Sequence, residues 1–133
     1  MKTQNPYKES MRYIDNARET LKLAGKEDRN YQDEKYVHSA CGIAYIGVLK
    51  ALNVLFNIKQ VPKKRGRKFI EYYQESLAKI DKKLLNYLNN AYQLLHLDCY
   101  YEGITNVKAI DEGFENAVLI IEALKPYSNN GLE

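Results

Sequence analysis

The sequence holds two histidines, His38 and His96, which are the first candidates for chemistry. Histidine changes charge near neutral pH, so it can accept and return a proton during a reaction. His96 lies late in a long helical segment, where it could act as a general base or contact a ligand. A histidine near a helix end also commonly bonds to the last carbonyl groups. His96 is therefore the candidate catalytic residue, with a structural role as the alternative.

Acidic and aromatic residues follow His96 closely. Asp98, Tyr100 and Tyr101 stand just after it, and Glu102 comes next. Tyrosines beside carboxylates can line a pocket for a nucleotide or a peptide. The other interpretation is that one tyrosine plugs the end of a helical bundle while its neighbour is exposed. We predict a ligand-binding site at Asp98, Tyr100 and Tyr101 and keep the second interpretation open.

A run of positive charge stands between the second and third helical segments. Five cations occupy six positions, at Lys63, Lys64, Arg65, Arg67 and Lys68. Such a cluster can neutralise several phosphate groups, which makes binding to nucleic acid strongly dependent on salt. A basic linker between helices is also often simply solvated. The formal net charge of +3 is too small to indicate a nucleic-acid-binding protein, so this prediction rests on the five residues alone.

The cysteines argue against metal and disulfide chemistry. Cys41 and Cys99 lie far apart and lack the paired spacing of a zinc site or of a secreted disulfide framework. We therefore expect two free thiols in a reducing compartment, with no metal and no cofactor. The first residues lack the apolar stretch of a signal peptide, and no run reaches the ~18 apolar residues of a membrane span. These features predict a cytoplasmic protein without membrane association.

Apolar residues recur at helical spacing along nearly the whole chain. Asn5 and Pro6 predict the start of a first helix that ends at Gly25, before a loop over 26–33. A second, broadly apolar helix should begin at Asp33 or Glu34, end at residue 56 and form the centre of the fold. The last helix should be capped by Thr105 or Asn106 and stopped by Pro126.

The third helical segment carries two apolar registers. Phe69, Tyr73, Leu77 and Ile80 share one register, and the apolar residues from Leu84 onward share another. Either a short helix leads into a longer one near residues 79–82, or one long helix bends there. The segment should end around residue 97, because the residues after it break the period with a glycine.

Short connections between long amphipathic helices favour antiparallel neighbours. We therefore predict an all-α fold: an up-and-down antiparallel bundle of four main helices, the third of which is open to being broken in two. Residues 1–127 form the single predicted domain. Residues 128–133 are expected to be a disordered tail, and its last two residues are consistent with a cloning remnant.

Three segments together carry a family resemblance: YKESMRYIDNARETLKLAG, SACGIAYIGVLKALNVLF and LLHLDCYYEG. They resemble the HEPN superfamily and, more narrowly, a small bacterial family of HEPN-like bundles classed as a domain of unknown function. The resemblance implies a helical bundle that is commonly dimeric. It further implies that active members are metal-independent ribonucleases, or partners of a nucleotidyltransferase in toxin and antitoxin pairs.

The chain departs from the ribonuclease motif that the resemblance implies, which is an arginine, four to six intervening residues and a histidine. Counting back from His96 through these spacings reaches Ala91, Asn90 and Asn89, and none is arginine. Metal-free cleavage of RNA needs a cation to stabilise charge on the phosphorane, and asparagine supplies none. His38 fails the same test. The departure argues against catalysis without excluding it.

The leading hypothesis is a non-catalytic interaction module that forms a homodimer or docks a partner protein such as a nucleotidyltransferase. Tyrosine is favoured at interfaces, and the chain has more tyrosines than a small core can hold with bonded hydroxyl groups. The alternative is an RNA-binding or ribonuclease-type protein that combines His96 with cations from residues 63–68. The tyrosines on which the dimer prediction rests are Tyr13, Tyr31, Tyr36, Tyr45, Tyr72, Tyr73 and Tyr87.

Overall fold

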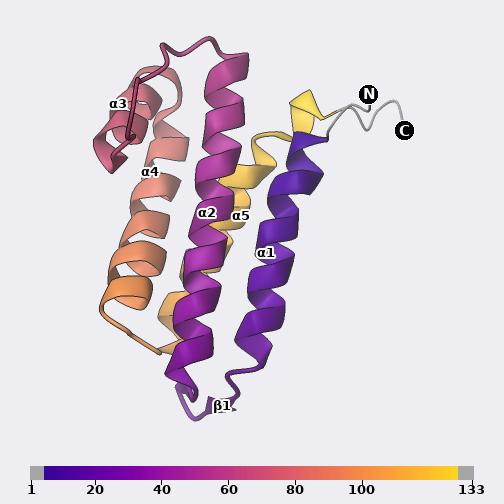
Figure 1. Cartoon of the computed structure of the whole chain (residues 1–133), viewed down its shortest axis with the longest axis vertical. Helices are drawn as coiled ribbons and strands as arrows, with labels where there is room; N and C mark the ends of the chain where they lie inside the picture. The colour runs from indigo at the N-terminus through magenta and orange to yellow at the C-terminus, as the bar shows by residue number, and fades with distance from the viewer. Residues whose placement is uncertain (1–4, 129–133) are drawn as a thin grey trace.

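The computed structural model describes residues 5–128, which form a predominantly helical chain (Figure 1). The prediction of an all-α fold is thereby confirmed at the level of a mostly helical protein. The predicted tail over 128–133 lies outside the described residues, except for Ser128. In chain order the described elements are α1 Pro6–Lys22, β1 Lys26–Glu27, β2 Asn30–Tyr31, α2 Glu34–Ile58, α3 Ile70–Ile80, α4 Lys82–Ala91, the π-helix η1 Tyr92–Tyr101, α5 Val107–Glu122 and the 3-10 turn η2 Lys125–Tyr127.

Polar side chains cap three helix starts at the predicted positions. The Asn5 side chain accepts a hydrogen bond from the backbone N–H three residues on, at 3.0 Å. Asp33 caps α2 by accepting from the backbone N–H two residues on, at 3.1 Å, and Asn106 caps α5 by accepting from the N–H three residues on, at 2.9 Å. Gly25 takes the left-handed φ of +71° shortly after α1. These boundaries follow directly from local sequence chemistry.

The loop predicted over 26–33 contains a small hairpin instead. β1 pairs antiparallel with β2, and Asp28 takes a positive φ in the turn between them. The hairpin also bonds to the start of α5, because the Tyr31 N–H donates to the Thr105 carbonyl at 2.9 Å and the Val107 N–H donates to Arg29 at 2.8 Å. Strands of two residues leave no readable alternation in a sequence, so the loop prediction was wrong here.

The third segment is broken at Asp81. This residue is extended, with φ −163° and ψ 96°, and its carboxylate caps α4 by accepting from the Leu84 N–H at 3.1 Å. A side-chain bond from Gln74 to Asn89 of 2.9 Å joins α3 to α4, which lie side by side in Figure 1. Of the two open alternatives, the short helix leading into a second one is the observed structure.

The α4 helix does not end near residue 97 as predicted. It continues as η1, in which the backbone widens to the i→i+5 pattern of a π-helix. Gly103, with φ +76°, then turns the chain toward α5. A glycine does follow the end of the helical segment, as predicted, but the segment ends at Tyr101 rather than near residue 97.

The core lies around α2, which packs against α1, α5 and η1. Most predicted core positions are buried, but Phe69 is 52% exposed because it stands before α3 rather than inside it, and Ile80 is 39% exposed.

By length and composition α2 could cross a membrane, contrary to the prediction that no segment could. In the structure 56% of its most apolar window is buried by other elements, as in the core helix of a globular fold.

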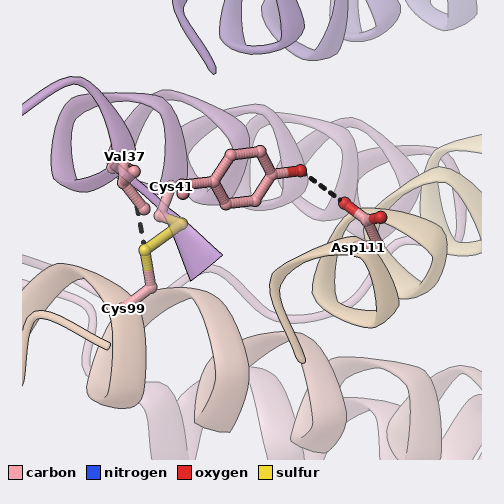
Figure 2. The surroundings of a disulfide bond; sticks show 5 residues. Val37, Cys41, Cys99 and Asp111 are labelled. Atoms are coloured by element: carbon pink, nitrogen blue, oxygen red, sulfur yellow. Dashed lines mark hydrogen bonds between the residues drawn. A yellow bond between two sulfur atoms is a disulfide. The ribbon is translucent and has the colours of Figure 1, made fainter. Parts of the chain in front are cut away.

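Cys41 of α2 and Cys99 of η1 form a disulfide bond, which overturns the prediction of free thiols (Figure 2). The two residues are 58 positions apart, and only the packing of η1 on α2 brings their Cα atoms to 6.2 Å. The Cys99 sulfur also lies 3.5 Å from the carbonyl oxygen of Val37. Both cysteines are fully buried, so the bond is an internal link between α2 and η1.

Candidate functional site

The most distinctive cluster of side chains lies where η1 crosses α2. We define the aromatic face as six residues from these two elements, namely His38, Tyr45, Tyr92, His96, Tyr100 and Tyr101. At its centre the ring centroids of His96 and Tyr45 are 4.7 Å apart, with an interplanar angle of 21°. The Tyr100 ring stacks on His38 at 4.4 Å and lies parallel to His96 at 6.0 Å. Rings from both elements thus form one stacked series.

The π-helical backbone explains why three η1 residues after Tyr92 meet at one place. In an α-helix a residue contacts its neighbours three and four positions on. A π-helix bonds residues five apart and brings them onto one side. The His96 ring therefore meets Tyr100 and also Tyr101, whose centroid is 5.0 Å away in an edge-on arrangement. An uninterrupted α-helix would turn Tyr101 away from His96.

The α2 backbone makes room for this stacking at Gly42. A Cβ atom on Gly42 would lie 3.1 Å and 3.2 Å from two carbons of the Tyr100 ring. The disulfide bond joins the residues that come immediately before this contact, because Cys41 precedes Gly42 and Cys99 precedes Tyr100. A covalent link therefore fixes the register between the two sides of the aromatic face.

The aromatic face runs from buried to exposed. Tyr45 is only 8% exposed, whereas Tyr100 is 37% and Tyr101 is 68% exposed. Burial lowers the pKa of His96. Burial, and then the neighbouring Tyr92 and Tyr73, raise the pKa of Tyr45. Both shifts favour the uncharged forms of His96 and Tyr45.

The predicted site residues near His96 separate into two sets. Tyr100 and Tyr101 join His96 on the aromatic face, and both are exposed, so neither plugs the end of the fold. Asp98 does not join them, because its carboxylate accepts a hydrogen bond from the Gln93 side chain at 2.9 Å. The His96 imidazole has ring contacts, and no hydrogen bond to a helix carbonyl is found within residues 5–128.

The predicted cations do not reach His96. Residues 63–68 form the exposed connection between α2 and α3. Lys63 and Lys68 line a cavity of about 350 Å³ with Asn53, which lies eight residues along α2 from Tyr45. That separation is about 12 Å of helix. Within one chain, the structure does not bring the cations and His96 into one catalytic centre.

Sequence reasoning considered His38 only as a candidate for the ribonuclease motif and Tyr45 only as an interface tyrosine, and it did not predict that Tyr92 joins them at the site. The signal was present, since Tyr92, His96 and Tyr100 recur every four residues. On α2, His38 and Tyr45 flank Gly42 at helical spacing. Nothing in the sequence alone indicated that the two stripes face each other.

A second hollow lies beside the hairpin. It has a volume of about 1040 Å³ and is lined by both acidic and basic residues of the hairpin and of α5. Asp111 at its edge accepts a hydrogen bond from the Tyr31 hydroxyl at 2.8 Å (Figure 2). Within residues 5–128, no group of three or more His, Cys, Asp or Glu side chains is arranged to hold a metal ion. This hollow therefore offers mixed surface charge rather than a defined site.

Comparison with known proteins connects the chain to a family and to solved structures. The family described as a domain of unknown function (DUF5618) matches residues 5–125. A solved protein of unknown function from Dyadobacter fermentans is 36% identical, with a TM-score of 0.80, and the match covers 92% of this chain and 94% of that one. No curated protein matches the chain.

Proposed function

The chain belongs to the family described as a domain of unknown function (DUF5618), and on that premise we propose that it is a non-catalytic interaction module that self-associates through the aromatic face. The observation that carries the proposal is the clustering of six aromatic rings on two covalently linked elements, with Tyr100 and Tyr101 open to solvent. The proposed oligomeric state is a homodimer.

The chemistry of the aromatic face suits a protein partner. Tyrosine is enriched at interfaces because its ring gives a large apolar contact and its hydroxyl still bonds to water or to a partner. Side chains that are already stacked lose little further freedom on binding, so the cost of ordering them is reduced. The disulfide bond and the rings beneath hold Tyr100 in this way, because it rests against both His38 and His96.

We further propose that the fold is an up-and-down antiparallel bundle of the HEPN-like kind, in a bacterial cytoplasm. The four long members would be α1, α2, the α4–η1 segment and α5, joined by the hairpin, by α3 and by a short turn (Figure 1). Disulfide bonds in the cytoplasm are mostly transient or redox-sensing, so in that compartment the Cys41–Cys99 pair would exchange between bonded and thiol forms.

Catalysis is not part of the proposal. A ribonuclease that used His96 would need a cation from the 63–68 connection of a second chain, since these cations lie about two turns along α2 from the aromatic face. The alternative partner for the same aromatic face is a nucleotidyltransferase. Self-association is favoured because it requires only the surface that the chain itself supplies.

Sedimentation velocity over a range of protein concentrations tests the proposal. We expect a dimer for the wild type and a monomer for the double variant Tyr100→Ser with Tyr101→Ser. Leu23→Ser is the matched control, because Leu23 is 64% exposed at the end of α1 and should keep the dimer. Thermal unfolding of each variant verifies its fold. A wild type that stays monomeric, or a double variant that still dimerises, would overturn the proposal.

A further inference from the structure

The connection between α2 and α3 carries charge that the interaction module does not use. We define the basic loop as residues 63–68, in which all five cations are exposed. The ion pairs among the described residues join Arg12 to Glu9, Lys22 to Glu19 and Lys125 to Glu122, and none involves the basic loop. Five neighbouring cations without ion-pair partners repel one another, and an incoming polyanion would relieve that repulsion.

The fold holds the base of this loop in place. The Val61 N–H donates to the Phe56 carbonyl at 2.9 Å, and the Tyr72 hydroxyl donates to the Pro62 carbonyl at 3.1 Å. The chain then turns at Gly66, where φ is +73° and a Cβ atom would meet nothing within 4 Å. The cations are therefore carried on an anchored loop that projects into open space.

Hydrogen-bond donors line part of the cavity beneath the basic loop, beside apolar side chains of α2. Its volume is about 350 Å³, and Lys63 and Lys68 line it together with Asn53 and Asn57. The Asn53 side-chain oxygen already accepts a bond from the Tyr73 hydroxyl at 3.0 Å. This arrangement leaves the Asn53 amide N–H groups available to donate, and such donors suit phosphate or sugar oxygens.

An exposed aromatic ring stands at the end of the loop. Phe69 is 52% exposed, and the guanidinium carbon of Arg67 lies 5.1 Å from its ring centroid. Cations that track a backbone beside a ring on which a base can stack are the combination that binds single strands. A duplex keeps its bases stacked internally and an acidic peptide has no base, so neither would use Phe69 in this way.

We propose that the basic loop, with Phe69 and the adjacent cavity, is a binding surface for single-stranded nucleic acid. The cations contact phosphates and the Phe69 ring stacks on one base. The surface lies at the opposite end of α2 from His38 and does not depend on the aromatic face. The proposal can therefore be tested independently of self-association.

Fluorescence anisotropy with a labelled single-stranded oligouridine, titrated at several salt concentrations, tests this surface. For three to five phosphate contacts, the slope of log K against log salt should be about −2 to −3.5. Neutralising all five cations to glutamine should weaken binding more than about tenfold at low salt and flatten the slope. Phe69→Ala should weaken binding about five- to hundredfold, because it removes one stacked base.

The matched control is Lys79→Gln with Lys82→Gln and Lys83→Gln, which removes three exposed cations next to the α3–α4 break. This variant should keep most of the wild-type affinity for the oligonucleotide. Adding Phe69→Ala to it should still weaken binding, as it does in the wild type. Equal losses from control and loop variants would overturn the proposal, and so would an undetectable wild-type complex at low salt. If Phe69→Ala binds as tightly as the wild type, and dextran sulfate competes as well as unlabelled oligouridine does, the loop binds polyanions in general and the proposal is overturned.

Discussion

The two sides of α2 are built in different ways. Toward α1, the helices approach so closely that a Cβ atom on Gly47 would lie 2.7 Å from the Cβ of Tyr13. Toward η1, the contact is made by a disulfide bond and stacked rings, and the outermost rings remain exposed. The first side is closed, and its close packing stabilises the fold. The second side holds exposed side chains in fixed positions, as an interface requires.

Breaking the disulfide bond on the η1 side should have the largest effect on the unfolding free energy. The bond closes a separation of 58 residues, so in the chain-entropy view its loss costs about 4 kcal/mol of unfolding free energy. Urea unfolding with and without a phosphine reductant measures this difference. The double variant Cys41→Ala with Cys99→Ala is the control, since reductant should not change it. A wild type whose midpoint ignores the reductant would contradict the structure.

Two glycines on α2 compare its sides directly. Gly47→Ala should lower the unfolding free energy by about 1–3 kcal/mol, because the Tyr13 Cβ is fixed to the α1 backbone and cannot move aside. Gly42→Ala should change it by less than about 1 kcal/mol, because contacts of 3.1 Å and 3.2 Å need the Tyr100 ring to give by only a few tenths of an ångström, and alanine favours the helix. Urea unfolding of both variants measures the difference. Equal costs would mean that the η1 side is as tightly closed as the α1 side.

The partly buried imidazole of His96 adds a pH dependence to the η1 side. Because burial lowers the pKa of His96, the unfolded chain binds a proton at a higher pH than the folded chain does. Stability should therefore fall as pH drops through about 6.5, the ordinary value for histidine, and this loss should stop below the lowered pKa of His96. Melting temperatures at pH 7.5 and pH 5.5 should differ less for His96→Gln than for the wild type. An unchanged difference would mean that the pKa of His96 is not lowered in the folded chain.

The smallest effect on stability is expected at the outermost ring. Tyr101 is 68% exposed, so Tyr101→Ser should change the unfolding free energy by no more than about 0.5 kcal/mol. The same change should raise the dimer dissociation constant, since Tyr101 lies at the proposed interface. Urea unfolding and sedimentation equilibrium measure the two quantities separately. A large loss of stability would indicate that Tyr101 belongs to the fold rather than to a binding surface.

Local chemistry made much of the fold predictable. Asn5, Asp33 and Asn106 are good caps at the boundaries of apolar periods, and each is observed to cap a helix. The change of register near residue 80 marked the break, where Asp81 caps the new helix. These features depend on neighbours within one or two turns, so the sequence contains the information needed.

The parts that failed depend on distant contacts. Cys41 and Cys99 meet only because η1 packs on α2, and no spacing in the sequence indicates this. The π-helical geometry brings Tyr101 to His96, and the apolar period of the segment does not indicate it. Phe69 fits the apolar period of its helix, yet the chain is still extended there and leaves the ring exposed. The candidate site was therefore only half visible, through His96, Tyr100 and Tyr101.

Hydrogen exchange followed by mass spectrometry at two protein concentrations tests the central claim most directly. Raising the concentration should slow exchange of the backbone N–H groups in residues 92–101 and in the part of α2 around His38 and Gly42, because the aromatic face becomes covered. Exchange in α1 should stay unchanged. Slowing that is confined to other elements, or no concentration dependence at all, would contradict self-association through the aromatic face.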